Sequence, residues 1–161
     1  MLSEGAGRAT TRAPRPDEVD GVSYHFLSHD EFERRRLNDD FLEYKEVFGQ
    51  GQWYGTLEQS VSDGQASGKW VILEIDVAGA LSVIDRIPDA ITIFINPGSM
   101  EELERRLRNR QTDSEEAILR RLQVAKHEMS NRHHYQHQIT NDEVDRAARQ
   151  VSQLLQALET K

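Results

Sequence analysis

Four segments of the sequence carry side chains that could hold a phosphorylated ligand. The first, residues 10–24, places Arg12, Arg15, Glu18 and Tyr24 on a loop that two prolines stiffen. Guanidinium groups suit two-point contacts with phosphate because their planar N–H fork matches the oxygens of the anion. A stiff loop with such donors can grip a phosphate, and the simpler alternative is a solvated turn.

The second segment combines an acid with hydroxyl groups. Glu43 comes before a glycine-containing turn, and Tyr54 and Thr56 come after it. A carboxylate can accept hydrogen bonds from the two neighbouring N–H donors of guanine, a pattern that adenine lacks, and the two hydroxyls could complete the pocket. The alternative for these residues is packing between two adjacent strands.

The third segment places Glu74 and Asp76 at the end of an apolar run, residues 70–75. The run has the composition of a parallel strand buried on both faces. Ligands of open α/β sheets bind at the carboxyl ends of the strands, so these acids could receive the base or ribose of a nucleotide, or Mg²⁺ through water. The alternative is that Asp76 only caps the following helix.

The fourth segment is rich in arginine and includes Arg106, Arg110 and, further along, Arg121. A basic segment between two helices suits a lid that closes over phosphates and stabilises their charge. The alternative is an exposed helical face paired with the nearby glutamates. The histidines at 133, 134 and 137 have no further ligand at a suitable spacing, so no metal site is predicted.

Composition limits the function classes. The 161 residues carry a net charge of −8, which argues against nucleic acid as a partner because its recognition needs a basic surface. No run reaches the roughly 18 apolar residues of a membrane span, so no membrane partner is expected. The absence of cysteine excludes disulfides and, with these features, leads us to expect a cytoplasmic protein.

The pattern of the sequence predicts a chain of mixed helices and strands. Residues 1–16 are expected to form a tail running into a loop, and Thr56 is expected to cap a helix ending near Gly68. Strands are predicted over residues 22–27, 41–48, 70–75, 90–95 and 136–140. The other predicted helices cover residues 29–37, 77–87, 100–108, 115–132 and 143–158. The strand–helix–strand unit from residue 70 to 95 implies parallel pairing.

Taken in this order and spacing, the segments resemble the guanylate kinase family. The motifs that carry the resemblance are Thr10-Thr11-Arg12-x-Pro14-Arg15-x-x-Glu18-x-x-Gly21-x-x-Tyr24-x-Phe26, Phe41-Leu42-Glu43, Tyr54-Gly55-Thr56, Leu73-Glu74-Ile75-Asp76, Phe94-Ile95 with Pro97, Leu103-x-x-Arg106-Leu107-x-x-Arg110, and Asn141-Asp142. Many matches in one order are far more specific than any single motif.

The resemblance implies a three-layer α/β fold of the P-loop-kinase type, with a parallel sheet, a small α+β GMP-binding insert and a helical lid. The implied regions are residues 1–21 for the tail and the start of the phosphate loop, 22–68 for GMP binding, 69–107 for the core, 108–119 for the lid and 120–161 for the C-terminal core. The implied reaction is phosphoryl transfer from MgATP to GMP, giving ADP and GDP.

The resemblance also implies a role for each candidate residue. The GMP phosphate would be held by Arg12, Arg15, Glu18, Tyr24 and the hydroxyl of Tyr54. The guanine base would be read by Glu43, Thr56, Glu74 and Asp76. The ATP phosphates and the transition state would be contacted by Arg106, Arg110 and Arg121, with Asn141 beside the adenine. Mg²⁺ would enter with ATP, and the small-molecule partners would be GMP and ATP.

The sequence departs from the family pattern near its start. Family members begin with a strand, a glycine-rich phosphate loop ending in Gly-Lys-Ser/Thr, and a helix, and the given sequence has no such segment before Thr10. Met1 is therefore expected to lie downstream of the true start, and the chain as given is expected to bind ATP poorly and turn over slowly. The residues just before Thr10 are Gly7-Arg8-Ala9, where the family usually has a serine that contacts the GMP phosphate. An alternative function is a catalytically inactive guanylate-kinase-like binding module.

Overall fold

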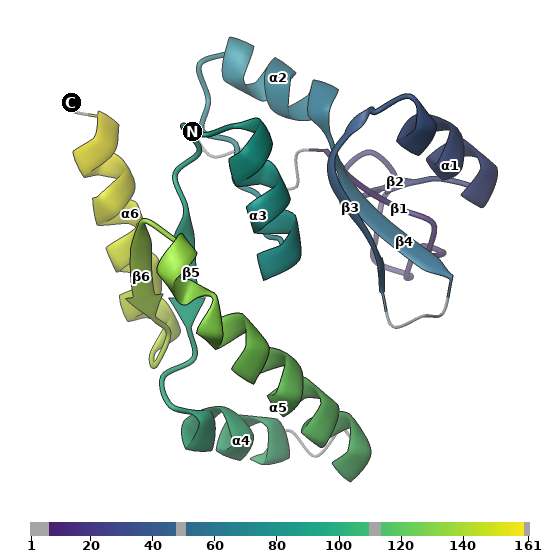
Figure 1. Cartoon of the computed structure of the whole chain (residues 1–161). Coiled ribbons are helices and arrows are strands. Elements are labelled where there is room, and N and C mark those ends of the chain that lie inside the picture. Colours follow the sequence, from purple (N-terminus) through teal and green to yellow (C-terminus); the bar gives the residue numbers. More distant parts are fainter. Residues whose placement is uncertain (1–6, 48–50, 110–113, 160–161) are drawn as a thin grey trace. The chain divides into compact units, whose positions relative to one another are not determined.

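The computed structural model describes residues 7–47, 51–109 and 114–159. The chain forms two compact units, residues 1–90 and residues 91–161 (Figure 1). Among the described residues, no helix combines the length and the apolarity that crossing a membrane requires.

The first unit is built on a four-stranded sheet. Its strands are β1 (Arg8–Thr10), β2 (His25–Phe26), β3 (Phe41–Val47) and β4 (Gln52–Leu57). Their order in the sheet is β2-β1-β4-β3, in which β1 runs parallel to β2 and antiparallel to β4, and β3 and β4 are antiparallel. The short strand β1 thereby brings the arginine-containing loop beside the β3–β4 pair.

Helix α1 (His29–Leu37) packs on this sheet through its buried residue Phe32. The Ser28 hydroxyl accepts a hydrogen bond from the backbone N–H of Glu31, which caps the helix at its start. Phe32 of the helix is buried and stacks on Phe41 of β3, with ring centroids 4.5 Å apart. This pair forms the centre of the first core cluster, together with Ala9 and Leu57.

A second core cluster joins β3 to helices α2 (Glu58–Ala66) and α3 (Val77–Arg86). Leu42, Val61 and Val83 are its buried members, one from each of the three elements. Arg86 ties α3 to the sheet, because its guanidinium donates to the Phe41 carbonyl oxygen at 2.9 Å and to two nearby carboxylates. The C-terminal end of α3 is thus fixed beside strand β3.

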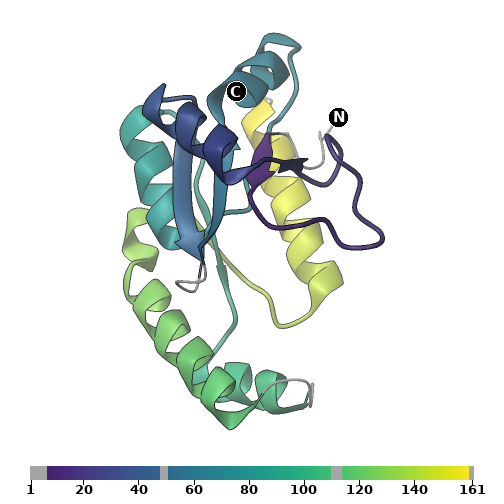
Figure 2. The same ribbon diagram turned by 90° about the vertical axis from the view of Figure 1, so that its right-hand side faces the viewer.

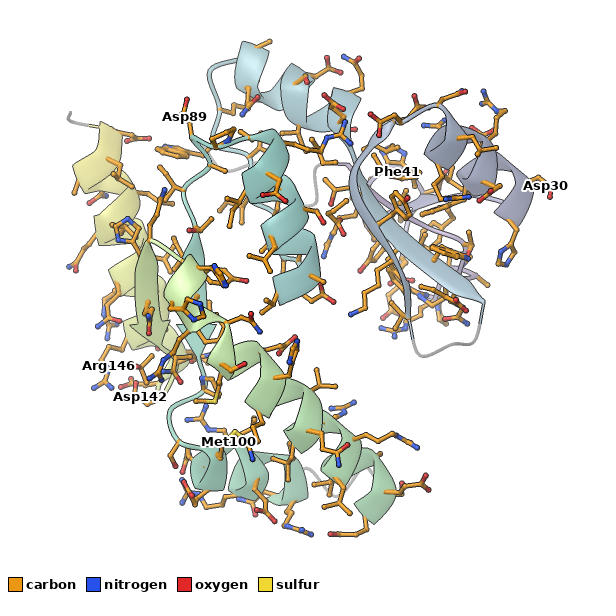
Figure 3. The ribbon with its side chains drawn as sticks, in the orientation of Figure 1. Asp30, Phe41, Asp89, Met100, Asp142 and Arg146 are labelled. Atoms are coloured by element: carbon orange, nitrogen blue, oxygen red, sulfur yellow. The ribbon has the colours of Figure 1, made fainter. Side chains whose placement is uncertain are left out.

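The second unit is helical around a two-stranded parallel sheet. Its elements are β5 (Ile93–Asn96), α4 (Met100–Asn109), α5 (Glu115–Ser130), a 3₁₀ turn η1 (Arg132–His134), β6 (His137–Thr140) and α6 (Val144–Glu159). Helices α4 and α5 contact each other, and α6 contacts β6 (Figures 1 and 2). Asp142 and Arg146 form an ion pair at the start of α6 (Figure 3).

Three sequence-based expectations about strands are wrong. Residues 8–10, expected in an unstructured tail, form β1, and only His25 and Phe26 of residues 22–27 pair as a strand. Residues 70–75, expected to form a strand that pairs in parallel with residues 90–95, form no strand among the described residues, apart from a single bridge at Val71. A run of apolar residues predicts burial but not hydrogen-bond partners, and here Ile72 is exposed as well.

The remaining element predictions differ from the structure mainly at their ends. The helix expected after Thr56 begins at Glu58, with Leu57 rather than Thr56 at the capping position, because strand β4 continues through Leu57 and the helix follows it directly. The predicted helix over residues 115–132 ends at Ser130, where the short turn η1 follows.

Candidate functional site

The first unit contains a pocket of about 190 Å³ that spans strands β1, β4 and β3 of its sheet. Three strands and the segment before α3 contribute its walls, which consist of Arg8, Ala9, Tyr24, Glu43, Lys45, Val47, Tyr54, Gly55, Thr56, Glu74, Ile75 and Asp76. Six of the nine residues predicted to bind GMP line this pocket: Tyr24, Glu43, Tyr54, Thr56, Glu74 and Asp76.

The other three predicted residues, Arg12, Arg15 and Glu18, lie next to the pocket and are held together. Arg12 donates two hydrogen bonds to the Glu18 carboxylate, at 2.9 and 2.8 Å, and its Nε donates to the Tyr54 hydroxyl at 3.0 Å. Glu18 also accepts from the backbone N–H of Arg15 at 2.7 Å. The loop is therefore closed on itself by one acid, and Arg12 reaches the pocket through Tyr54.

Glu18 remains ionised over nearly the whole pH range. The hydrogen bonds from Arg12, and next from the Arg15 backbone, lower the pKa of Glu18 to about 2. The same ion pair raises the pKa of the Arg12 guanidinium. Because both charges persist, the orientation of Arg12 is fixed before any ligand arrives.

Backbone and hydroxyl contacts fix the start of this loop on strand β4. The Thr10 hydroxyl donates to the Trp53 carbonyl oxygen at 2.9 Å, and the Trp53 N–H donates to the Thr11 hydroxyl at 2.9 Å. Tyr24 and Tyr54 meet edge to face, with centroids 6.0 Å apart. These contacts place two tyrosines and an arginine at one end of the pocket.

The other end of the pocket is acidic. The Thr56 hydroxyl donates to Glu43 at 2.6 Å, across the β3–β4 pair. Burial, together with the nearby Asp76 charge, raises the pKa of Glu43 despite this hydrogen bond. Asp76 caps α3 by accepting from the Gly79 N–H at 2.9 Å. Asp76 therefore caps a helix and also lines the pocket, and its role in reading a base stays a prediction.

Lys45 is paired with Asp76 inside the pocket. Burial acts to raise the pKa of Asp76, but the hydrogen bonds from Lys45 and from the Gly79 backbone outweigh it, and the net pKa is lowered. Asp76 is therefore ionised at neutral pH. Sequence reasoning missed Lys45, although strand alternation could have found it, because residues 43 and 45 of one strand share a face.

Gly79 allows the Glu43 carboxylate to lie against the first turn of α3. A Cβ atom at residue 79 would stand 2.9 Å from Oε2 of Glu43 and 3.3 Å from its carboxyl carbon. Those separations are shorter than ordinary van der Waals contact, so only glycine leaves the carboxylate in place.

Glu74 and Arg8, which both line the pocket, form an ion pair. Glu74, predicted to read a base, has a side chain that is 90% exposed, and its ion pair is with Arg8 at 3.5 Å. Arg8 was missed as a site residue because its strand was not predicted. Its guanidinium carbon lies over the Tyr24 ring, 4.8 Å from the centroid.

The second unit holds the other predicted residues. Arg106 of α4 donates to the backbone oxygen of Asn141 at 2.6 Å and to Glu102 at 3.0 Å, so the structure brings Arg106 and Asn141 together. Arg121 lies exposed on α5. Arg110 lies outside the described residues. No cluster of three metal-ligating side chains occurs within the described part of the chain.

Known proteins resemble the chain closely. A family model described as guanylate kinase matches residues 8–158. A guanylate kinase from Rhodopirellula baltica is 56% identical over 149 residues, which are 91% of this chain and 71% of that protein. A guanylate kinase from Clostridium perfringens (strain SM101 / Type A) is 44% identical over 149 residues, covering 92% and 68% respectively.

A solved structure agrees with these matches. The crystal structure of guanylate kinase from Anaplasma phagocytophilum has a TM-score of 0.77 at 32% identity, covering 97% of this chain and 76% of that chain. The fold and the matches together show that the chain belongs to the guanylate kinase family. It is therefore a kinase, and the expected α/β fold of the P-loop-kinase type is confirmed.

Proposed function

We propose that the pocket of the first unit binds GMP, with the guanine base at the acidic end and the phosphate at the arginine–tyrosine end. The observation that carries this proposal is the Glu43–Thr56 pair in the same pocket as Tyr24 and Tyr54. A guanine-reading carboxylate and phosphate-binding hydroxyls thus occupy one cavity, as a nucleoside monophosphate requires.

The acidic end favours guanine over adenine through hydrogen-bond polarity. A Glu43 carboxylate, when ionised, accepts hydrogen bonds only, so it matches the adjacent N–H donors of guanine. Adenine would turn a ring-nitrogen lone pair toward the same carboxylate and leave buried polar groups unpaired, which costs tenfold or more in affinity. Thr56 steadies Glu43, and Asp76 adds a second acceptor.

The arginine–tyrosine end matches the charge of a phosphate. Arg12 is oriented by Glu18 and by Tyr54, so little side-chain freedom is lost when the anion binds. Tyr24 and Tyr54 supply hydroxyl groups, and we assign Arg15 to the same phosphate. This end of the site holds the acceptor phosphate for attack on a donor.

For the reaction, we propose transfer of the γ-phosphoryl group from MgATP to GMP, giving ADP and GDP. An acceptor phosphate oxygen attacks the γ-phosphorus and the bond to ADP breaks, so the protein acts mainly by positioning and by neutralising charge. We assign Arg106, Arg110 and Arg121 to the transferring phosphates and Asn141 to the adenine. The support for these four roles is family membership.

Mg²⁺ enters this proposal as part of the substrate MgATP. The described residues contain no cluster of three His, Asp or Glu side chains that could hold a metal ion. Mg²⁺ is commonly bound by substrate phosphates with one or two carboxylates and several waters. We therefore assign no described residue to the metal.

Calorimetric titration separates the binding proposal from the transfer proposal. We expect GMP to bind the purified chain at least about tenfold more tightly than AMP, and Glu33→Gln, outside the pocket on α1, to leave both affinities unchanged. A coupled assay of ADP release with GMP then tests transfer separately. Equal affinities for GMP and AMP would contradict the base-reading role of the pocket.

A further inference from the structure

Arg8 lines the pocket, and one of its N–H donors lacks a hydrogen-bond acceptor among the described residues. It pairs with Thr56 in the β1–β4 register, and its guanidinium lies over the Tyr24 ring at 4.8 Å. Its Nε atom is buried and has no hydrogen-bond partner among the described residues. A buried N–H donor without an acceptor is costly, and pockets that receive an anion are where such a donor is useful.

Glu74, the acid that pairs with Arg8, holds it weakly. Glu74 stands 3.5 Å away, beyond the usual length of a charge-assisted hydrogen bond, and its side chain is 90% exposed. An ion pair with one solvated partner contributes little and is screened by salt. A ligand phosphate could therefore replace Glu74 at small cost.

Arg12 differs from Arg8 in this respect. Its bonds to Glu18, to Tyr54 and to the Ala13 carbonyl oxygen use four of its five N–H donors. Glu18 also neutralises its charge at short range. At the tyrosine end of the pocket Arg8 is thus a cation whose Nε donor is unused, and both arginines lie near the Tyr24 ring.

We infer that Arg8 is a further phosphate-binding residue, which donates its unused N–H groups to the phosphate of the bound GMP and releases Glu74 to solvent. This inference rests on the proposed GMP site. It assigns Glu74 the role of a counter-ion for Arg8 in the ligand-free protein. Under this inference, Arg8 contributes to binding of the GMP phosphate more than to binding of the base.

The test compares GMP with guanosine, which lacks the phosphate, by calorimetric titration. We expect Arg8→Met to weaken GMP binding about tenfold or more, because a charge-assisted contact is lost, and to leave guanosine binding unchanged. Arg8→Lys keeps the charge without the planar fork and should fall between the two. Arg34→Met, on α1 outside the pocket, is the matched control, and circular dichroism checks that each variant is folded.

A Glu74→Gln variant distinguishes the two roles of that acid. If Glu74 acts as a counter-ion for Arg8, removing its negative charge should tighten GMP binding a few-fold at low salt and leave guanosine binding unchanged. If Glu74 reads guanine, both ligands bind more weakly and the inference is wrong. Unchanged GMP affinity in Arg8→Met, with GMP still preferred over AMP, refutes the role of Arg8 alone, whereas wild-type protein that does not distinguish GMP from AMP refutes the proposed site itself.

Discussion

A single methyl group at residue 79 should disable the base end of the pocket while the fold remains stable. The Cβ of Gly79→Ala would meet three atoms of the Glu43 side chain, at 2.9, 3.3 and 3.4 Å. Because carbon–oxygen contacts below about 3.4 Å are repulsive, the carboxylate must move by roughly 0.5 Å. A displacement of that size lengthens or misdirects both hydrogen bonds that Glu43 is proposed to make with guanine.

The two effects on the protein differ in size. Loss of hydrogen bonds to a charged acceptor costs about 1.5–3 kcal/mol, which is roughly a tenfold to hundredfold loss of GMP affinity. Stability should change by less than about 1 kcal/mol, because alanine is the better helix former and offsets the disturbed Thr56–Glu43 bond.

Calorimetric titration with GMP and thermal unfolding would measure these effects together. Ser82→Ala, on the exposed side of the same helix, is the matched control and should leave GMP binding unchanged. Gly79→Ala protein that binds GMP like the wild type would refute the placement of Glu43 against the first turn of α3. A chain that unfolds on this substitution would refute the assumption that the helix tolerates the methyl group.

Three further predictions concern charge. Glu43→Gln should lower GMP affinity about tenfold or more and should not lower the melting temperature, because burial raises the pKa of Glu43 and the amide removes that cost; a lower melting temperature in calorimetry would contradict this. The depressed pKa of Glu18 means that this residue stabilises the fold at pH values above its ordinary pKa near 4.5 and loses that contribution as the pH falls toward about 2. Urea unfolding across that pH window should therefore show a shallower dependence of the unfolding free energy on pH in Glu18→Gln than in the wild type. The same pH dependence in both proteins would be inconsistent with the Arg12 ion pair. Arg86→Met should lower the free energy of unfolding by about 1–2 kcal/mol, since it removes the bond to Phe41, with no loss of GMP affinity beyond the folded fraction.

Helices were predictable from local signals, and short strands were not. Ser28, Asp76 and Ser114 mark helix starts in the sequence, and each caps its helix in the structure. Strand β1 spans three residues, too few to show an alternating pattern, and it exists because β2 and β4 offer it hydrogen bonds. Such pairing depends on residues far away in the chain, which local patterns do not report.

The candidate site was predictable where one strand pair and one helix cap define it. Glu43 and Thr56 lie opposite each other on the antiparallel pair β3–β4, so the hairpin places these two residues together, and the capping rule places Asp76 at the start of α3. Arg8 and Lys45 were missed because their side-chain direction follows from strand register. The assignments of Arg106, Arg121 and Asn141 to ATP remain predictions.

The most direct measurement is a crystal structure of the chain with GMP bound. The account predicts that the guanine base contacts Glu43 and Thr56, and that the phosphate lies at the end of the pocket formed by Tyr24, Tyr54 and Arg8. GMP bound outside this pocket, or with its phosphate beside Asp76, would contradict the account.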